Sequence, residues 1–320
     1  MSDRISVALA TCNGANYLPD LLNSLVAQHI PPFELVASDD VSTDTTLKIL
    51  EQFASVAPFE VRILRNTTRL GVADNFARTI AACSGEIIAL ADQDDVWHPQ
   101  KLARLELALS QPNAQAAFSN ADVVGADLLP LGYTMWQRVG FSSGEQMRME
   151  RGDGFAVLLK HSIVTGATLA FRSHLRDVAL PIPAGWAHDA WLAHNAAARG
   201  RIVAIPEPLI AYRQHAGNVV GGLAKPVVRE ICSALALDRG AWYQSELNRW
   251  KALAERLESA NPATPVPACL NEKIEHLRRR AELPQIRWQR IAPILREVLA
   301  GKYARYARNW GSIAIDLLVK

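Results

Sequence analysis

The sequence predicts an α/β fold in which a mostly parallel sheet is flanked by helices, with a helical C-terminal region after it. Short apolar runs alternate with helical patterns in the first part of the chain, polar clusters follow those runs, and the final part carries helical periodicity alone. A chain of 320 residues is also longer than the usual single core. We therefore expect one large domain over residues 1–222 and a helical, basic region over residues 223–320.

Four strands and three helices alternate in the first part of the chain. The strand candidates are apolar runs bounded by turn residues, and the helix candidates repeat apolar residues every three or four positions. Strands are expected at 5–10, 33–37, 61–64 and 86–91, and helices at 17–28, at 72–83 and from a cap at Ser42 or Thr43 to residue 53. Because strands joined by helices run parallel, their carboxyl ends should share the sheet edge at which such sheets bind ligands.

The rest of the chain divides into a mixed stretch and a helical one. Strands are expected at 116–118, 168–171 and 202–205, and a helix at 187–198. Beyond Gly222, helical patterns cover 231–257, 270–283, 285–299 and 303–318, and the proline-rich run 261–267 predicts a linker.

Composition and charge narrow the class of protein. Hydrophobic residues make up 49% of the chain and charged residues 21%, which favours a packed core and excludes wholesale disorder. The net charge of +2 is the sum of two opposite regional charges, −5 over residues 1–224 and +7 over residues 225–320.

The four cysteines lack the spacing of a zinc site or a disulfide framework. Without a signal peptide or an apolar span, we expect a cytoplasmic protein, either free or resting on the inner face of the cell membrane.

A dense acidic cluster follows the fourth expected strand. Asp92, Asp94 and Asp95 fall within four residues, directly after the apolar run 87–91. Like charges at this density repel one another. A hard divalent cation such as Mg²⁺ or Mn²⁺, which prefers oxygen ligands and bridges to substrate phosphates, would compensate. The alternative is a solvated acidic turn that caps the following helix.

Other polar clusters lie at the ends of neighbouring elements. Asp39 and Asp40 end the second strand, where they can address a nucleotide or simply cap the next helix. Asp189 opens a helix, and an acidic residue there also complements the helix dipole, so ordinary capping is its alternative role. His215 belongs to the polar run 212–218, which could close over phosphates or be a plain surface loop.

Taken together and in this order, the motifs resemble the family 2 inverting glycosyltransferases of GT-A fold, in particular the bacterial rhamnosyltransferase-like branch. The resemblance spans residues 5–222. It rests on the motifs at 10–14, 38–44, 85–97, 188–191 and 207–215. It implies a GT-A domain, which is a Rossmann-like nucleotide-binding sheet, with an α-helical C-terminal appendage.

The resemblance also implies roles for individual residues. The donor nucleotide would be contacted from the first two loops and by a basic residue beyond them, at Thr11, Asn13, Asp40 and Arg69. Asp92 and Asp94 match the two acids of the DXD motif, with Asp92 supporting the ribose or a metal-bound water. Asp94 would be the main ligand of a Mn²⁺ or Mg²⁺ ion, and His215 would complete that site. Asp189 falls where the family has its catalytic base.

Two positions depart from the family pattern. Cys12 stands where an aromatic residue commonly stacks on the base, and Val41 replaces a glycine after the paired acids. If the backbone at position 41 needs a positive φ, a valine would be strained there, so we expect a local adjustment. Neither change removes a group with chemical work to do.

The implied activity is transfer of a sugar from a nucleoside-diphosphate sugar, dTDP-rhamnose or a UDP-hexose, to a saccharide or lipid-linked acceptor, with inversion. Such a reaction would serve cell-surface polysaccharide or lipopolysaccharide synthesis. Two alternatives stay open. A sugar nucleotidyltransferase would need a glycine- and lysine-rich phosphate loop, and residues 11–16 contain no lysine. A catalytically silent scaffold would bind nucleotide sugars without turning them over.

Aromatic and basic residues are interleaved in the C-terminal region. The aromatic residues that alternate there with arginines are Trp242, Trp250, Trp288, Trp310, Tyr303 and Tyr306. This composition suits an anionic membrane surface. The alternatives are packing on the first domain or on a second copy of the chain in a homo-oligomer. Because no nucleic-acid-binding motif is present, nucleic acid is not an expected partner.

Overall fold

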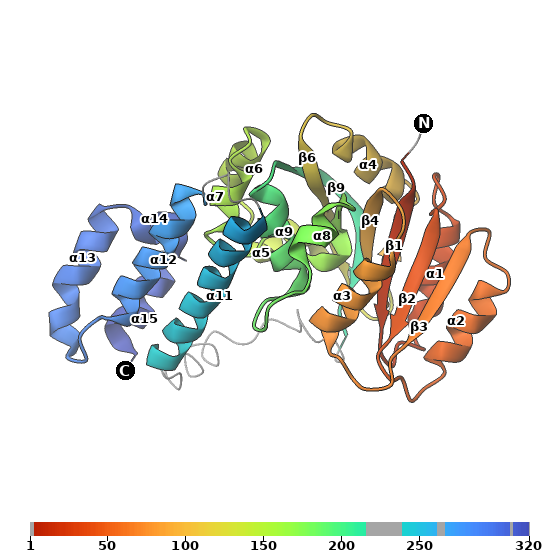
Figure 1. Cartoon of the computed structure of the whole chain (residues 1–320), viewed down its shortest axis with the longest axis horizontal. Helices are drawn as coiled ribbons and strands as arrows, with labels where there is room; N and C mark the ends of the chain where they lie inside the picture. Colours follow the sequence, from red (N-terminus) through yellow and green to blue (C-terminus); the bar gives the residue numbers. More distant parts are fainter. Residues whose placement is uncertain (1–2, 216–238, 261–265, 308–309, 320) are drawn as a thin grey trace. The chain divides into compact units, whose positions relative to one another are not determined.

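The computed structural model describes residues 3–215, 239–260, 266–307 and 310–319 (Figure 1). Its contacts divide the chain into two compact units. The first comprises Met1–Gly154, Ile163–Ile182 and Trp186–Val219, and the second Phe155–Ser162, Pro183–Gly185 and Val220–Lys320. The boundary expected after Gly222, the start of the helix expected from residue 231 and most of the linker expected at 261–267 lie outside the described residues.

The first unit is built on a mixed sheet. Its strands are β1 (Ile5–Thr11), β2 (Glu34–Asp39), β3 (Glu60–Arg65), β4 (Ile87–Asp92), β5 (Val96–Trp97), β6 (Ala114–Val124), β7 (Pro130–Thr134), β8 (Leu169–Arg172) and β9 (Arg201–Arg213). They follow the order β3-β2-β1-β4-β8-β6-β9-β5, and β7 pairs with β6. The first four strands are parallel, β8 runs antiparallel to both its neighbours, and β6 and β9 are parallel again. The expected α/β fold is confirmed, with antiparallel pairs confined to the later strands.

Helices cover both faces of this sheet (Figure 1). They are α1 (Leu18–Val26), α2 (Thr46–Ala54), α3 (Val72–Ala82), α4 (Lys101–Leu109), α5 (Met135–Val139), α6 (Ser143–Glu150), α8 (Leu175–Ala179), α9 (His188–Ala197) and the short η1 (Gly166–Thr168), while α7 (Gly154–Leu158) belongs mainly to the second unit. The strand order reverses direction after β3, so right-handed crossovers place α3 on the face opposite α1 and α2. There α3 packs on β1 and β2, and α9 packs beside it.

The core of the first unit holds the central strands rigidly. β1 and β4 are continuous apolar runs because both of their faces are covered by helices, and their interior residues are almost fully buried. α1 contributes Leu18, Leu21 and Leu25 at helical spacing to the same core. A strand fixed in this way fixes the position of its last residue, and polar residues stand at the ends of β1, β2 and β4.

The second unit is a set of helices with a polar centre. The described ones are α11 (Arg239–Ala260), α12 (Ala268–Ala281), η2 (Arg287–Arg290), α13 (Ile291–Leu299), α14 (Lys302–Tyr306) and α15 (Trp310–Leu318). At their centre the fully buried Asp316 accepts hydrogen bonds from Arg280 Nε at 2.7 Å, Tyr303 Oη at 2.6 Å and Tyr243 Oη. Among the described residues, no helix has both the length and the apolar character needed to cross a membrane.

Several expected element bounds differ from the structure; the strand expected at 116–118, for example, is the 11-residue β6. The helix expected over 303–318 is two helices, because Ala307 is extended at φ −144° and ψ 172° and ends α14. α2 begins at Thr46 rather than after Ser42, since the Asp44 carboxylate accepts the Thr46 N–H at 2.9 Å just before the helix. β9 is a 13-residue strand, Arg201–Arg213, where a strand over 202–205 was expected.

Candidate active site

Three strand ends meet at the carboxyl edge of the sheet, as expected. The parallel register pairs Thr11 with Asp39 and Ala10 with Asp92. The Thr11 side chain is 1% exposed, and its hydroxyl donates to Asp39 Oδ1 at 3.1 Å. Thr11 therefore lies at the predicted position, with its hydroxyl turned inward to Asp39.

The loops after β1 and β2 are bonded to each other. Asn13 N donates to Ser42 Oγ at 2.8 Å, and Asn13 Oδ1 accepts the Thr43 N–H at 2.8 Å. Asn13 and Val41 both have positive φ, at 50° and 58°. The expectation of a local backbone adjustment at Val41 is therefore wrong. The backbone keeps the positive φ that suits glycine, and this conformation is strained for a β-branched valine.

Asp40 anchors a third loop, the one that follows β3. Its carboxylate accepts the N–H groups of Leu70 at 2.7 Å and Gly71 at 2.9 Å, together with an asparagine side chain. Burial alone would raise the pKa of Asp40, but these hydrogen bonds and the charge of Arg69 lower it. The Arg69 guanidinium lies against Cys12 Sγ, at 2.7 Å. Asp40 and Arg69, two of the residues predicted to contact the donor, therefore both lie next to Cys12, which departs from the family pattern.

Gln93, the middle residue of the DXD motif, hydrogen-bonds the end of β4 to the loop that follows β1. Its side-chain oxygen accepts the Cys12 N–H at 2.9 Å, and its side-chain nitrogen donates to the Cys12 carbonyl at 3.0 Å. A Cβ on Gly14 would lie 2.2 Å from the Gln93 side-chain oxygen, so a larger residue there would displace the Gln93 amide from Cys12. Sequence reasoning gave Gln93 no role, although its place between two acids was the available signal.

The carboxylates of the site interact strongly. Burial raises the pKa of Asp92 to about 7, the charges of Asp94 and Asp189 add to that increase, and the charge of Lys101 opposes it. The expected catalytic base, Asp189, thus adds its negative charge to the potential at Asp92.

Asp95 and Lys101 form the buried floor of this acidic cluster. Asp95 is 1% exposed, and its Oδ1 accepts the Arg213 N–H at 3.1 Å. Burial and the charges of Asp94 and Asp92 raise its pKa well above the usual range. Lys101 is fully buried, donates to the Ala167 carbonyl at 2.7 Å, and has its pKa lowered by burial. Asp95 is therefore a structural acid, and Lys101 was missed because a helix-start lysine carries no signal of burial.

His215 meets Asp94, as the expected metal pair requires. His215 Nε2 lies 2.8 Å from Asp94 Oδ2, and the histidine ring packs on Tyr17 with 4.6 Å between ring centroids. The remainder of the segment expected to close over phosphates, from residue 216 onward, lies outside the described residues.

Arg213 holds the end of β9 to three other parts of the site. Its side chain is 3% exposed. Nε donates to the Asp94 carbonyl at 2.8 Å, Nη2 to Asp20 Oδ2 at 2.7 Å, and Nη1 to the Ala126 carbonyl at 2.6 Å. Its guanidinium also lies over the Tyr17 ring. Arg213 stands in a motif that the sequence singled out, yet only the fold reveals its partners.

Asp189 is held at the first turn of α9. Its Oδ2 accepts the Gly166 N–H at 3.0 Å, and its Oδ1 accepts the Ala190 N–H at 2.7 Å. The buried His188 stacks on Phe76, with 4.0 Å between ring centroids. A Cβ on Gly166 would lie 2.6 Å from His188 Nε2. Gly166 is thus a second glycine at which a side chain would clash with a neighbour, and its N–H holds Asp189 at the start of α9. Sequence reasoning missed it.

The donor set at the sheet edge fits a hard divalent cation that shares its coordination with a substrate. Among the described residues, no three His, Cys, Asp or Glu side chains converge into a ready-made metal site. Asp94 and His215 supply two donors. Mg²⁺ and related ions are commonly held by one or two carboxylates, with substrate phosphates and water completing the coordination.

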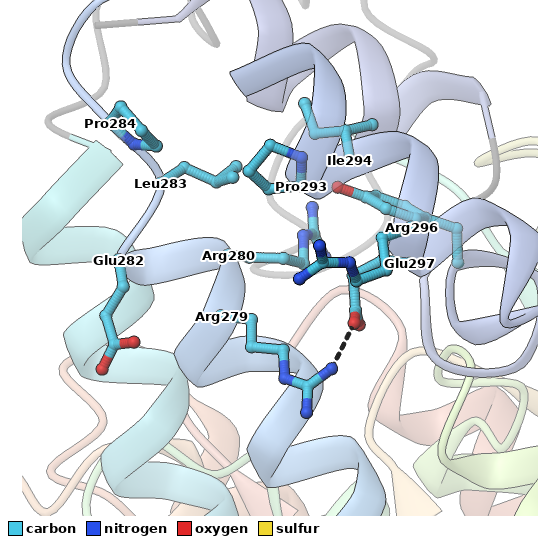
Figure 2. A pocket seen from close by; sticks show the side chains of 10 residues that line it. Arg279, Arg280, Glu282, Leu283, Pro284, Pro293, Ile294, Arg296 and Glu297 are labelled. Carbon is cyan, nitrogen blue, oxygen red and sulfur yellow. Dashed lines mark hydrogen bonds and ion pairs between the residues drawn. The ribbon is translucent and has the colours of Figure 1, made fainter. Parts of the chain in front are cut away.

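The second unit holds a cavity of a different kind. It measures about 540 Å³ and lies between α12 and α13 (Figure 2). Arg279 and Arg280 line it, but Arg279 is paired with Glu297 at 2.7 Å and Arg280 with Asp316 at 2.7 Å. These ion pairs make it part of the helical scaffold, so we place the candidate active site in the first unit.

The mixed sheet flanked by helices, with acidic residues at its carboxyl edge, defines an α/β fold of GT-A type. A family model described as "Glycosyl transferase family 2" matches residues 6–176, more than half of the chain. The chain therefore belongs to glycosyl transferase family 2. This assignment confirms the family that the motifs suggested.

Relatives and solved structures agree with this assignment. The chain is 26% identical over 219 residues to an uncharacterised glycosyltransferase of Nostoc sp. and 26% identical over 258 residues to the dTDP-rhamnosyl transferase RfbG of Shigella flexneri. The matches cover 67% and 75% of this chain, and 66% and 82% of those proteins. The chain thus spans slightly less than two thirds of the Nostoc protein and 60% of three mycobacterial relatives.

Two solved structures share the fold. S. aureus TarS 1–349 in complex with UDP-GlcNAc has a TM-score of 0.58 at 16% identity, covering 95% of this chain and 89% of that one. The mannosyltransferase PcManGT from Pyrobaculum calidifontis, in complex with GDP-Man and Mn²⁺, has a TM-score of 0.54 at 19% identity, covering 94% and 76%. At these identities the likeness concerns the fold alone.

Proposed function

We propose that this chain transfers a sugar from a nucleoside-diphosphate sugar to a hydroxyl of a saccharide or lipid-linked acceptor, with inversion, in cell-surface polysaccharide synthesis. The favoured donors are dTDP-rhamnose, by analogy with the Shigella relative, and a UDP-hexose, by analogy with the TarS structure. The chain would act in the cytoplasm.

One observation carries the proposal: His215 and Asp94 are in contact at the carboxyl edge of the sheet, where β4 also ends in Asp92. His215 Nε2 lies 2.8 Å from Asp94 Oδ2, and the charge of Asp189 adds to the raised pKa of Asp92. In open α/β sheets this edge is where ligands bind. A scaffold that only held a nucleotide would have no use for the further carboxylate of Asp189, whose charge acts on Asp92, and this favours an enzyme.

In the proposed reaction, Asp189 accepts the proton of the acceptor hydroxyl. That oxygen then bonds to the anomeric carbon as the bond to the leaving diphosphate breaks on the opposite side, which inverts the configuration. The N–H groups of Gly166 and Ala190 hold one oxygen each of the Asp189 carboxylate and orient it. Thr11, Asn13, Asp40 and Arg69 shape the donor loops, directly or through their neighbours.

Asp94 and His215 would hold Mn²⁺ or Mg²⁺ together with the donor diphosphate. A bound ion of this kind neutralises the charge that develops on the leaving phosphate. Asp92, beside this pair, would support the ribose or a water of the site.

The test is calorimetric binding of UDP and dTDP, with and without Mn²⁺, to the wild type and to Asp94→Ala. We expect one nucleotide to bind in a metal-dependent manner and Asp94→Ala to abolish that dependence. With the donor identified, Asp189→Asn should lower turnover by about 10²–10⁴-fold, the contribution of a general base, while leaving donor affinity nearly unchanged.

Each outcome separates the alternatives. Metal-dependent binding without donor hydrolysis or transfer would favour the silent scaffold. Unchanged turnover in Asp189→Asn would remove Asp189 from the reaction. Absence of UDP, dTDP and GDP binding at any Mn²⁺ concentration would overturn the proposal as a whole.

A further inference from the structure

A row of large apolar side chains stands in solvent along one face of η2 and α13. Trp288, Ile291, Leu295 and Leu299 are 71%, 50%, 53% and 87% exposed. Their spacing of three and four residues places them on one side of the helix. We call these four residues the α13 stripe. Ile286, 51% exposed, lies just before it.

The opposite face of α13 is already occupied by the unit's own core. Ile294 is 3% exposed and clusters with Leu283 and Tyr303. Glu297 is 6% exposed and is bonded to His276 Nδ1 at 2.7 Å. A surface helix normally pairs such a core face with a polar outer face. α13 instead turns a charged residue, Glu297, inward and leaves large apolar side chains in solvent, and a contiguous apolar row in solvent marks an interaction surface.

The exposed charges within η2 and α13 are basic. Over residues 287–299 the exposed charged side chains are Arg287 and Arg296, and Glu297 is buried, while the exposed Glu282 lies five residues before Arg287. Arg296 also lines the cavity on the neighbouring side of α13 (Figure 2). A partner of the stripe must therefore accept aromatic and aliphatic side chains and carry negative charge.

We propose that the α13 stripe docks the protein on an anionic lipid surface. A tryptophan, three aliphatic side chains and flanking arginines on one helix are what an interfacial helix uses, the apolar side chains entering the headgroup boundary and the cations pairing with acidic lipids. This surface lies in the second unit and needs neither the nucleotide nor the reaction of the first.

A second copy of the chain fits this surface less well. A two-fold dimer would bring each patch against its own copy, so Arg287 and Arg296 would face the same arginines. Stable dimers also bury about 20–30 residues on each side, and the α13 stripe is a single row on one helix. Charge complementarity thus selects acidic lipid over another copy.

The experiment is sedimentation of the full chain with vesicles of phosphatidylcholine alone and of phosphatidylcholine with an equal amount of phosphatidylglycerol. We expect at least tenfold tighter binding to the acidic vesicles, weakened by salt. Trp288→Ser, Ile291→Ser and Leu295→Ser combined should reduce binding at least tenfold. Arg287→Gln with Arg296→Gln should reduce it roughly tenfold, because each basic residue near an acidic surface contributes to partitioning.

A matched control removes three exposed apolar side chains from the first unit, Val56→Ser, Leu107→Ser and Leu129→Ser, which are 77%, 62% and 63% exposed. It should bind as the wild type does, and circular dichroism with thermal melting checks that all variants fold. The proposal would be overturned if the wild type bound acidic vesicles no more tightly than neutral ones, or if the stripe variant bound them as tightly as the control variant does. Stripe-dependent dimers in light scattering without vesicle binding would also overturn it, by assigning the surface to a second copy.

Discussion

Val41 concentrates backbone strain in one residue of the donor loops. Its φ of 58° lies in the left-handed region, which costs an L-residue about 1–2 kcal/mol and glycine almost nothing. Glycine in turn gives up about 0.5–1 kcal/mol through the greater freedom of the unfolded chain. Val41→Gly should therefore raise the free energy of unfolding by about 0.5–1 kcal/mol, measured as a higher urea midpoint at unchanged slope.

The matched control is Val56→Gly, an exposed valine without a positive φ. It should leave the midpoint unchanged or lower it, since no strain is there to relieve. If the two variants shift the midpoint alike, the strain at Val41 does not affect stability.

The end of β9 positions the site through one buried side chain. Arg213 reaches the carbonyls of Asp94 and Ala126 and the carboxylate of Asp20 with a planar fork that lysine cannot reproduce. Charge-assisted hydrogen bonds contribute about 1.5–3 kcal/mol each, so Arg213→Lys should lose roughly 2–4 kcal/mol of stability. Because His215 follows two residues later, Mn²⁺-dependent nucleotide affinity should also fall, by about tenfold.

Calorimetry in the presence and absence of Mn²⁺ separates positioning from plain structural support. Arg199→Lys is the control: Arg199 Nη1 donates to the backbone carbonyl and the side-chain oxygen of Asn195, four residues earlier in the chain. It should leave nucleotide affinity intact. Wild-type metal-dependent affinity in Arg213→Lys would show that the end of β9 does not position His215.

The sequence predicts elements well where a local pattern decides them. β1 to β4 were foreseen within a few residues, because buried apolar runs end at polar turns, and with them the shared edge of Thr11, Asp40 and Asp92. Contacts between segments that are far apart in the sequence leave no local sequence pattern from which they could be predicted. Neither the closeness of Gly166 to His188 nor the burial of Lys101 is visible in local spacing, since both depend on how α9 and η1 pack.

At the scale of the whole chain, the two units place their acidic side chains differently. In the first unit, Asp92 and Asp94 lie at the carboxyl edge of the sheet, where a ligand can meet them, whereas the buried Glu34 is paired with Arg62. In the second, charge is neutralised internally: Asp316 is bound by Arg280 and two tyrosines, and Glu297 by His276 and Arg279. In the described part of this unit, the exposed basic side chains are mainly arginines: Arg278, Arg279, Arg287, Arg296 and Arg305.

This internal network makes the second unit sensitive to acid. Burial lowers the pKa of His276 from 6.5 to about 4, and the charges of Arg280 and Lys273 add to that decrease, while Glu297 opposes it. The native state thus prefers the neutral imidazole, whereas the unfolded chain takes up a proton below about pH 6.5. The contribution to stability is complete above pH 6.5 and is lost progressively as the pH falls towards 4, amounting to about 2 kcal/mol between pH 7.5 and 5.

Scanning calorimetry of the full chain at pH 7.5 and 5 should record this loss as a lower unfolding temperature for the second unit. In His276→Gln, an amide can still donate to Glu297 but does not titrate, so the shift between the two pH values should shrink to a fraction of the wild-type shift. The pKa of Glu297 is also lowered, and its contribution is lost only below its unfolded value near 4.5, so it leaves this comparison intact. An equal shift in both proteins would mean that His276 is protonated in the native state at pH 5 and that another group carries the acid sensitivity.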